Sequence, residues 1–312
     1  MFTNKNIFIA LTYNCNAFCK KCMTRYHKNK SIQMDMKTLN TIINLLNVNS
    51  YKGVISVGTG EPLLYSNIEY FISNILNIND SIKLRLLTNG MLLTPDLTDD
   101  YFNPRCVWGV TMDGFYNTTV QSVQKGVNIE TVKNNVREVA KKHGGSAIYL
   151  NFTVYNHNVD EIIPFCEFAI RNNITDIYLT ELKVFNGFET GLQEFSLVHD
   201  EHLMSVLQKA KTMLDYNNIS TKGISIDKTY HRDNCFKQKL ASPIIDVDGS
   251  VSFCSGREDV YIGNIMEENI LSKWASVYNS LLKSSDAWCS LCFDKKLPNG
   301  SYRLPKTIIK ET

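Results

Sequence analysis

Short apolar runs alternate with longer amphipathic stretches over the first two thirds of the chain. The short runs are rich in β-branched residues and read as strands, at 7–12, 54–57, 83–87, 107–112, 147–154 and 176–180. The amphipathic stretches have the apolar spacing of helices, near 34–47, 66–79, 128–142, 159–172 and 199–216, with a shorter link at 94–103. Six successive strand–helix units predict an α/β fold with a parallel sheet and right-handed crossovers, either a barrel or an open sheet.

The pattern changes at about residue 218, where short strand-like pieces with turn residues replace the regular alternation. The next long helical pattern lies at about 265–283. We therefore predict one domain over 1–217 and a small α+β domain over 218–312. Inside the second domain, Asp248-Gly249 lies between two apolar runs and predicts a type I′ hairpin, whose second strand delivers Cys254.

Polar and glycine-rich residues follow the predicted strands at the points where the strands end. They are Asn14-Cys15-Asn16, Gly58-Thr59-Gly60-Glu61-Pro62, Thr88-Asn89-Gly90, Thr111-Met112-Asp113-Gly114, Asn156-His157-Asn158 and Glu181. Each cluster alone is ordinary turn chemistry, since Gly, Asn and Asp commonly close such turns. Because the carboxyl ends of parallel strands meet at one edge of a sheet, the six clusters together favour a single functional site.

Composition narrows the class of protein. The 312 residues are 44% hydrophobic and 21% charged, as in ordinary globular proteins. The net charge of +2 gives no electrostatic reason to expect a nucleic-acid or membrane partner. No apolar run approaches the roughly 18 residues that cross a bilayer, and no signal peptide is recognisable, so we expect a cytoplasmic protein. Nine cysteines are an odd number, and a reducing compartment disfavours a disulfide framework.

Three of the cysteines, Cys15, Cys19 and Cys22, form a CxxxCxxC run directly after the first predicted strand. Thiolates bind soft metals, so this run is a candidate metal site for zinc or for an iron-sulfur cluster. A structural zinc ion needs a fourth ligand, and His27 is the only nearby residue that offers one. Three ligands on a four-iron cluster would instead leave one iron open to another molecule.

Together, Cys15-Asn16-Ala17-Phe18-Cys19-Lys20-Lys21-Cys22 and Gly58-Thr59-Gly60-Glu61-Pro62 resemble the motifs of the radical S-adenosylmethionine (SAM) superfamily. The resemblance implies a partial (β/α)6 TIM-like barrel. It also implies a 4Fe-4S cluster on the three cysteines, whose open iron chelates the methionine part of SAM. An electron passed to SAM then releases a 5′-deoxyadenosyl radical.

The same resemblance assigns SAM-binding residues. Glu61 and its neighbours Gly58, Thr59 and Gly60 would bind the methionine amino group, Thr111 would lie near the ribose, and Asn89 falls in the corresponding strand-three loop. The chain departs from the family pattern at two positions. Lys21 stands where an aromatic residue commonly lies against the adenine, and Thr59 stands where many members have glycine.

A second group of cysteines, Cys235, Cys254, Cys289 and Cys292, resembles the Twitch form of the C-terminal SPASM extensions of this superfamily. Gly263-Asn264-Ile265 and Trp274 lie within the matched region. The resemblance implies an auxiliary 4Fe-4S cluster. Four cysteines saturate such a cluster, so its use would be electron transfer. The alternative is a structural zinc site of four thiolates.

The remaining candidates concern the reaction. Cys106 and Cys166 read as core residues, whereas His157 and Glu181 lie at strand ends and are candidate catalytic bases. Since no spare thiol is well placed to return a hydrogen atom, we expect electron loss to the auxiliary cluster and a net oxidation.

Resemblance to Twitch dehydrogenases implies a sugar or aminocyclitol alcohol as the substrate of that oxidation. The alternatives are epimerisation or cross-linking of a ribosomally made peptide and, outside catalysis, an iron-sulfur or zinc redox sensor. The electron donor would be a flavodoxin or a ferredoxin.

Overall fold

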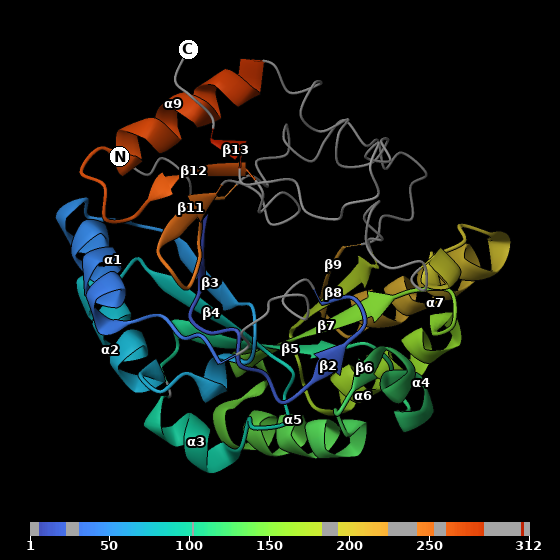
Figure 1. Cartoon of the computed structure of the whole chain (residues 1–312). Coiled ribbons are helices and arrows are strands. Elements are labelled where there is room, and N and C mark those ends of the chain that lie inside the picture. Colours follow the sequence, from blue (N-terminus) through green and yellow to red (C-terminus); the bar gives the residue numbers. More distant parts are fainter. Residues whose placement is uncertain are drawn as a thin grey trace.

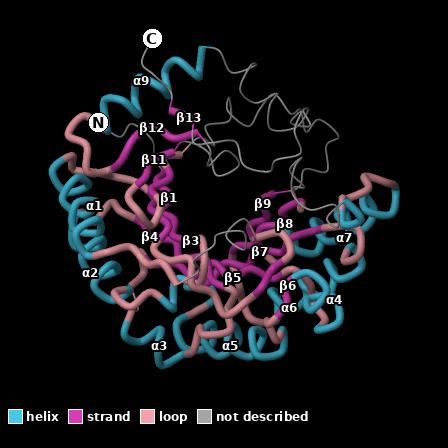
Figure 2. Tube along the Cα trace, in the orientation of Figure 1, coloured by secondary structure: helices cyan, strands magenta, loops and turns pink. Residues whose placement is uncertain are grey.

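The computed structural model describes residues 6–22, 31–101, 103–182, 193–223, 242–252, 260–283 and 307–308. These residues form a curved and largely parallel sheet with helices along its outer face (Figures 1 and 2). The strands of the sheet follow the order β13-β12-β11-β10-β1-β3-β4-β5-β7-β8-β9. The sheet is open, so the expected α/β class and partial barrel are confirmed.

The six strands predicted from the sequence form the middle of this sheet, side by side and all parallel. They are β1 (Asn6–Ala10), β3 (Val54–Gly58), β4 (Lys83–Thr88), β5 (Cys106–Met112), β7 (Ile148–Val154) and β8 (Asp176–Glu181). Their carboxyl ends therefore meet at one edge of the sheet, and this edge carries the polar clusters identified in the sequence.

Helices connect these strands and pack on the convex face, as Figure 1 shows. They are α1 (Met36–Val48), α2 (Ile68–Ile78), α3 (Pro95–Asp100), α4 (Asn117–Val123), α5 (Ile129–His143), α6 (Ile162–Arg171) and α7 (Glu201–Tyr216). The helical stretches predicted from apolar spacing are thus confirmed. The shorter link at 94–103 contains the six-residue helix α3, which begins at Pro95. None of the helices in the described ranges is long and apolar enough to cross a membrane.

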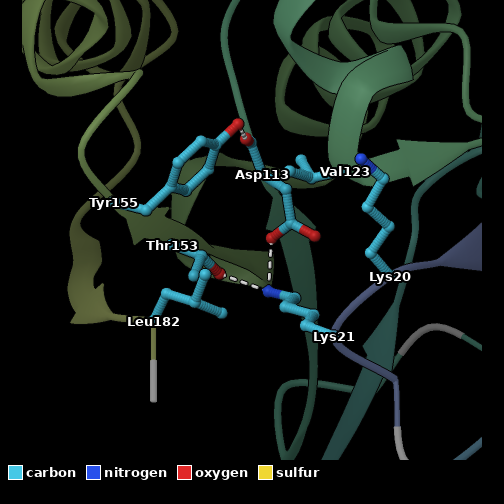
Figure 3. Close-up of a pocket in the computed structure, with 7 residues that line it drawn as sticks. All are labelled: Lys20, Lys21, Asp113, Val123, Thr153, Tyr155 and Leu182. Carbon is cyan, nitrogen blue, oxygen red and sulfur yellow. Dashed lines mark hydrogen bonds and ion pairs between the residues drawn. The ribbon is translucent and has the colours of Figure 1, made fainter. Parts of the chain in front are cut away.

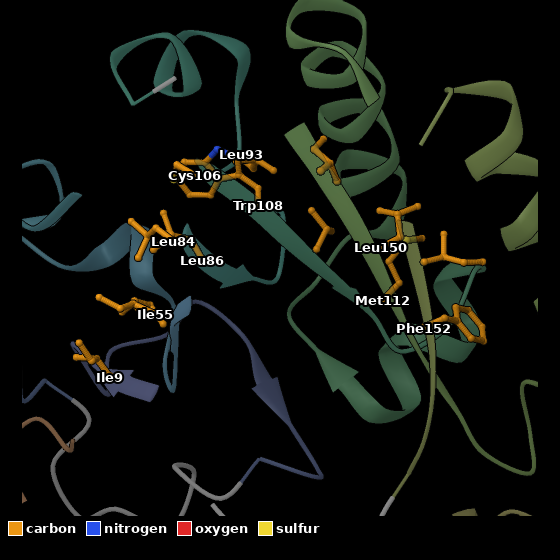
Figure 4. Close-up of a cluster of buried hydrophobic side chains, with 14 of the residues drawn as sticks. Ile9, Ile55, Leu84, Leu86, Leu93, Cys106, Trp108, Met112, Leu150 and Phe152 are labelled. Carbon is orange, nitrogen blue, oxygen red and sulfur yellow. The ribbon is translucent and has the colours of Figure 1, made fainter. Parts of the chain in front are cut away.

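The core lies between the sheet and these helices. Every second strand residue points into it, and Ile55, Trp108 and Leu150 are at most 2% exposed (Figure 4). Cys106 and Cys166 are buried in the same layer, which confirms them as core residues. Because they are buried, the pKa of each thiol is raised to about 12. Neither thiol is therefore ionised at neutral pH.

Strands from the C-terminal part of the chain continue the sheet at both edges. At one edge β9 (Ser220–Gly223) lies parallel to β8, and at the other β10 (Ile244–Ile245) lies parallel to β1. Beyond β10 follow β11 (Ser250–Ser252), β12 (Val260–Asn264) and β13 (Thr307–Ile308), with α9 (Ile270–Lys283) beside them. The division at 217/218 stays a prediction, and the sheet includes strands from both sides of it.

The hairpin predicted around Asp248-Gly249 is present, but its turn is of another type. β10 and β11 pair antiparallel, with Ile245 opposite Val251. Only Gly249 has a positive φ, of 78°, and its N–H donates to the carbonyl of Asp246. A type I′ turn needs positive φ at both central residues, so this connection is a type I turn closed by a left-handed glycine.

Candidate functional site

The CxxxCxxC loop leaves the carboxyl end of β1 and is fixed by a small sheet of its own. Its residues Phe18 and Cys19 form β2 (Phe18–Cys19), which pairs with β6 (Gln124–Lys125) just after α4. The backbone N–H of Lys20 donates to the carbonyl of Val123 at 2.7 Å. This pairing between segments about a hundred positions apart was not predicted from the sequence.

The three cysteines of the loop are half-buried and free of disulfides. Burial raises the pKa of the Cys15 and Cys19 thiols, and charge on the neighbouring Cys22 raises both further. For Cys15 and Cys19 the protein alone therefore favours the neutral thiol, whereas iron would stabilise the thiolate by its positive charge. No three His, Cys, Asp or Glu side chains within the described ranges are grouped to hold a single metal ion. The donor set of three thiols fits the open-iron cluster implied by the family.

The turn after β3 lies directly against this cysteine loop. The backbone N–H of Glu61 donates to the carbonyl of Asn14 at 2.7 Å. Gly60 has a φ of +68°, and a Cβ atom there would lie 2.4 Å from the carbonyl oxygen of Thr12. Only glycine allows so close an approach of the two backbones.

Thr59 adopts a φ of 70°, a left-handed conformation that is strained for a β-branched residue. The departure from glycine at this position, noted in the sequence, therefore has a conformational cost in the structure. Thr59 directly follows Gly58, which is buried beside the ring of Phe8.

The Glu61 carboxylate is 1% exposed and accepts three hydrogen bonds. The donors are the Thr88 hydroxyl at 2.7 Å and the backbone N–H groups of Asn89 at 2.9 Å and Leu63 at 3.3 Å. Burial raises the pKa of this carboxyl, and the hydrogen bonds oppose the shift. Since an ionised carboxylate has about four acceptor positions, about one remains for a ligand.

Asn89 connects the end of β4 to the cysteine loop. Its side-chain nitrogen donates to Asn16 Oδ1 at 2.6 Å, and its Oδ1 accepts from the backbone N–H of Met91 at 3.0 Å. The same nitrogen lies 4.0 Å from Cys15 Sγ. The structure thus brings Asn89, Glu61 and the cysteine loop together, as the strand-end rule predicts.

Thr111 lies further along the sheet edge. It is half-buried on β5 and stands opposite Asn151 of β7, whose side-chain oxygen accepts from the Thr180 hydroxyl at 3.0 Å. Because strand side chains alternate, these three polar residues line the concave face of the sheet, away from the apolar core. A ligand on this face would meet hydroxyl and amide groups.

An ion pair that sequence reasoning missed lies beside the cysteine loop (Figure 3). Lys21 Nζ is 2.5 Å from Asp113 Oδ1 and 2.5 Å from the Thr153 hydroxyl. Asp113 is 1% exposed, and its Oδ2 has no hydrogen-bond partner among the described residues. A small cavity borders the group, lined by Lys20, Lys21, Asp113, Val123, Thr153, Tyr155 and Leu182. The signal in the sequence was Lys21 itself, a charge where the family commonly has an aromatic ring.

The two candidate bases lie outside this cavity. His157 is exposed, and its ring centre lies 5.1 Å from that of Phe195. Glu181 ends β8 with its Oε1 3.3 Å from His199 Nε2. Since Thr180 faces Asn151, strand alternation turns Glu181 to the opposite face of the sheet. Their catalytic role stays a prediction.

The second cysteine group lies outside the described residues, as does His27. The auxiliary cluster on Cys235, Cys254, Cys289 and Cys292 therefore stays a prediction. Of the surrounding sequence, the structure describes Trp274, which is 1% exposed on α9, and Gly263, which lies in β12.

Comparison with known proteins agrees with this geometry. The chain is 26% identical over 297 residues to a GTP 3′,8-cyclase of Helicobacter pylori (strain HPAG1), covering 89% of this chain and 88% of that protein. It is 26% identical over 205 residues to a GTP 3′,8-cyclase of Alkaliphilus metalliredigens, covering 64% and 62% of the two chains.

Solved structures share the fold. The chain superimposes on native anSMEcpe with bound AdoMet and Cp18Cys peptide with a TM-score of 0.68 at 15% identity, covering 88% of this chain and 81% of that one. For Streptococcus suis SuiB bound to S-adenosylmethionine the TM-score is 0.66 at 14% identity, covering 89% and 67%.

Residues 9–169 match the radical SAM superfamily, and this range includes the cysteine loop, the end of β1 and the whole of β3, β4, β5 and β7. The family match spans more than half of the 312 residues. The chain belongs to the radical SAM superfamily.

Proposed function

We propose that Cys15, Cys19 and Cys22 hold a 4Fe-4S cluster that binds SAM, and that the protein removes a hydrogen atom from an organic substrate. The observation that carries this proposal is that the cysteine loop is hydrogen-bonded to the backbone of Glu61 and to the side chain of Asn89. When bound, the cluster and SAM supply a 5′-deoxyadenosyl radical. Folds of this kind bind their substrates at the edge of the sheet where the carboxyl ends of the parallel strands meet.

The side chains around the cluster have distinct proposed roles toward SAM. Glu61 keeps about one free acceptor position, which suits the methionine ammonium group. The backbone of Gly58, Thr59 and Gly60 lies in the same turn and gives the ligand close access. Thr111 offers a hydroxyl on the concave face for the ribose, and Asn89 orients the loop that carries Cys15.

The test is anaerobic reconstitution followed by reduction with dithionite in the presence of SAM. We expect formation of 5′-deoxyadenosine, and we expect its loss when Cys15, Cys19 and Cys22 are all changed to Ala. With a second cluster on Cys235, Cys254, Cys289 and Cys292, the protein would hold about eight irons and the triple variant about four. SAM cleavage that survives the triple substitution would contradict the proposal.

Glu61→Gln tests the SAM contact separately from the cluster. Replacing the charged acceptor should weaken SAM binding by about 1.5–3 kcal/mol, or roughly 10- to 150-fold. Glu69→Gln, on the exposed face of α2, is the matched control and should bind SAM as the wild type does. Equal SAM affinity of the two variants would show that Glu61 is not a SAM ligand.

The sequence resemblance and the comparisons favour different substrate classes. The sequence resemblance favours a sugar or aminocyclitol alcohol, oxidised by loss of an electron to the auxiliary cluster with His157 or Glu181 as the proton acceptor. The comparisons give no support to that choice. Similarity to GTP 3′,8-cyclases over 89% of the chain favours a purine nucleotide as a second candidate.

Mass spectrometry distinguishes the candidates. Reduced protein and SAM are incubated separately with GTP, with an aminocyclitol and with a peptide encoded near the gene. An aminocyclitol product two mass units lighter supports the oxidation, whereas consumption of GTP alone supports the nucleotide. A flavodoxin or ferredoxin that replaces dithionite in the productive reaction would identify the class of electron donor.

A further inference from the structure

We propose that Lys21 and Asp113 form a charge-balanced pair in which each charge offsets the effect of the other on the reduction potential of the cluster on Cys15, Cys19 and Cys22. This inference rests on the proposed function, since it needs the cluster. Lys21 and Asp113 act here through the cluster ligands, so they are positioning residues rather than contacts of the substrate.

The geometry fixes both charges beside the cluster loop. Lys21 directly precedes Cys22, and its ammonium group is 2.5 Å from Asp113 Oδ1 and from the Thr153 hydroxyl. Asp113 follows β5 directly, and its backbone carbonyl accepts from the Tyr155 hydroxyl at 2.8 Å. The Asp113 carboxylate at the end of β5 and the Thr153 hydroxyl on β7 thus both accept hydrogen bonds from the Lys21 ammonium group (Figure 3).

The negative charge of the Asp113 carboxylate is buried and has few hydrogen-bond donors around it. Asp113 is 1% exposed, and its Oδ2 has no hydrogen-bond donor within the described part of the chain. The Lys21 side chain is 25% exposed, so bulk water screens the pair only partly. Removing either partner would therefore leave an uncompensated charge close to the cysteine ligands.

The two opposite charges lie next to the proposed cluster ligands. Lys21 stands between Cys19 and Cys22 in the loop, and its ammonium group is 2.5 Å from the Asp113 carboxylate. A cluster bound to these cysteines would experience two opposing fields.

The sign of each effect follows from electrostatics. Reduction adds one negative charge to the cluster, so a nearby cation stabilises the reduced form and raises the potential, and a nearby anion lowers it. With both charges present the two effects largely cancel. Lys21→Met should therefore lower the potential, and Asp113→Asn should raise it.

A double variant shows whether a change in the reduction potential comes from the lost charge or from a displaced loop. Lys21→Met with Asp113→Asn removes both charges and should return the potential close to that of the wild type. Lys21→Arg keeps the charge and should also stay close. Lys142→Met, which removes an exposed ion pair with Asp99 between α5 and α3, is the matched control and should leave the potential unchanged.

The potential is measured by redox titration followed by electron paramagnetic resonance, using the signal that changes when SAM is added. This choice separates the SAM-binding cluster from any auxiliary cluster. Opposite shifts in the single variants and recovery in the double variant are the expected result. Shifts of the same sign, no shift, or a double variant that stays displaced would overturn the inference.

Iron loading is measured first for every variant. If Lys21→Met loads too little iron, Asp113→Asn alone carries the test, and a potential that does not rise overturns the inference. A wild-type signal that fails to respond to SAM would instead refute the proposed function itself, and the role of the pair with it.

Discussion

Gly60→Ala should disrupt the contact between the turn after β3 and the cysteine loop. The new Cβ would lie 2.4 Å from the carbonyl oxygen of Thr12 and 2.7 Å from that of Asn14. Both neighbours are backbone atoms, so the loop that carries Cys15 must move by several tenths of an ångström. The left-handed φ of +68° adds about 1–2 kcal/mol for a residue with a Cβ.

Two other glycines provide a graded comparison, since they share the positive φ but not the contact. At Gly144, with a φ of +86°, a Cβ would meet nothing within 4 Å. At Gly126, with a φ of +92°, it would lie 3.1 Å from the carbonyl oxygen of Asn16. The backbone penalty is offset in part by about 0.4–1 kcal/mol from reduced freedom of the unfolded chain. For Gly144→Ala we expect a loss of about 1–3 kcal/mol, because a φ of 86° with a ψ of 153° is open essentially only to glycine. For Gly60→Ala we expect about 1–3 kcal/mol from overpacking in addition to its backbone cost.

Urea unfolding followed by circular dichroism measures the stability, and iron content with 5′-deoxyadenosine formation measures the site. Gly144→Ala should keep its iron and its SAM cleavage. Gly60→Ala should lose both in addition to stability, and Gly126→Ala should lie between the two. Equal losses for Gly60→Ala and Gly144→Ala, with SAM cleavage intact in both, would refute the reasoning from close backbone contact.

Two further substitutions test local features. Thr59→Gly should relieve the strain of a φ of 70° and raise the free energy of unfolding by about 0.5–1 kcal/mol, measured by urea unfolding; a fall in stability would contradict the assigned strain. Asp35→Ala should cost about 1 kcal/mol, because Asp35 Oδ1 caps α1 by accepting from the backbone N–H of Thr38 at 2.7 Å. This hydrogen bond lowers the pKa of Asp35, so its contribution is present above about pH 3.9 and is lost as the pH falls through the lowered value. Unfolding midpoints at pH 7 and pH 3 should show the difference shrinking in acid, whereas a constant difference would exclude the charged cap.

The parallel sheet and its functional edge were predictable from the sequence because the signals are local. Each central strand is a short apolar run, and each is followed by its own polar turn, as Val57 is by Gly58-Thr59-Gly60-Glu61. Parallel topology then brings all the carboxyl ends to one edge, whatever the side chains are. The contact of Asn89 with the cysteine loop follows from that rule alone.

Features that depend on contacts between distant segments were not predictable in this way. The pairing of Cys19 with Gln124 joins two strands of two residues each, which are too short to leave a hydrophobic period. The dipeptide Asp248-Gly249 is typical of a type I′ hairpin. The register in which β11 pairs with β10 instead gives a type I turn closed by Gly249. In both cases the tertiary pairing, rather than the local sequence, decides the conformation.

Lys21 shows why a departure from a family pattern is informative only with coordinates. In the sequence it is one of two adjacent lysines, and a solvated ammonium group is the ordinary outcome for such a pair. In the structure Lys20 and Lys21 differ. Lys20 Nζ lies 5.0 Å from the centre of the Phe195 ring, whereas Lys21 pairs with a buried carboxylate. Burying Asp113 without Lys21 would be strongly unfavourable, so the residue before Cys22 and the residue after β5 depend on each other. A lysine in place of an aromatic residue therefore brings a charge that pairs with a buried carboxylate into the cysteine loop.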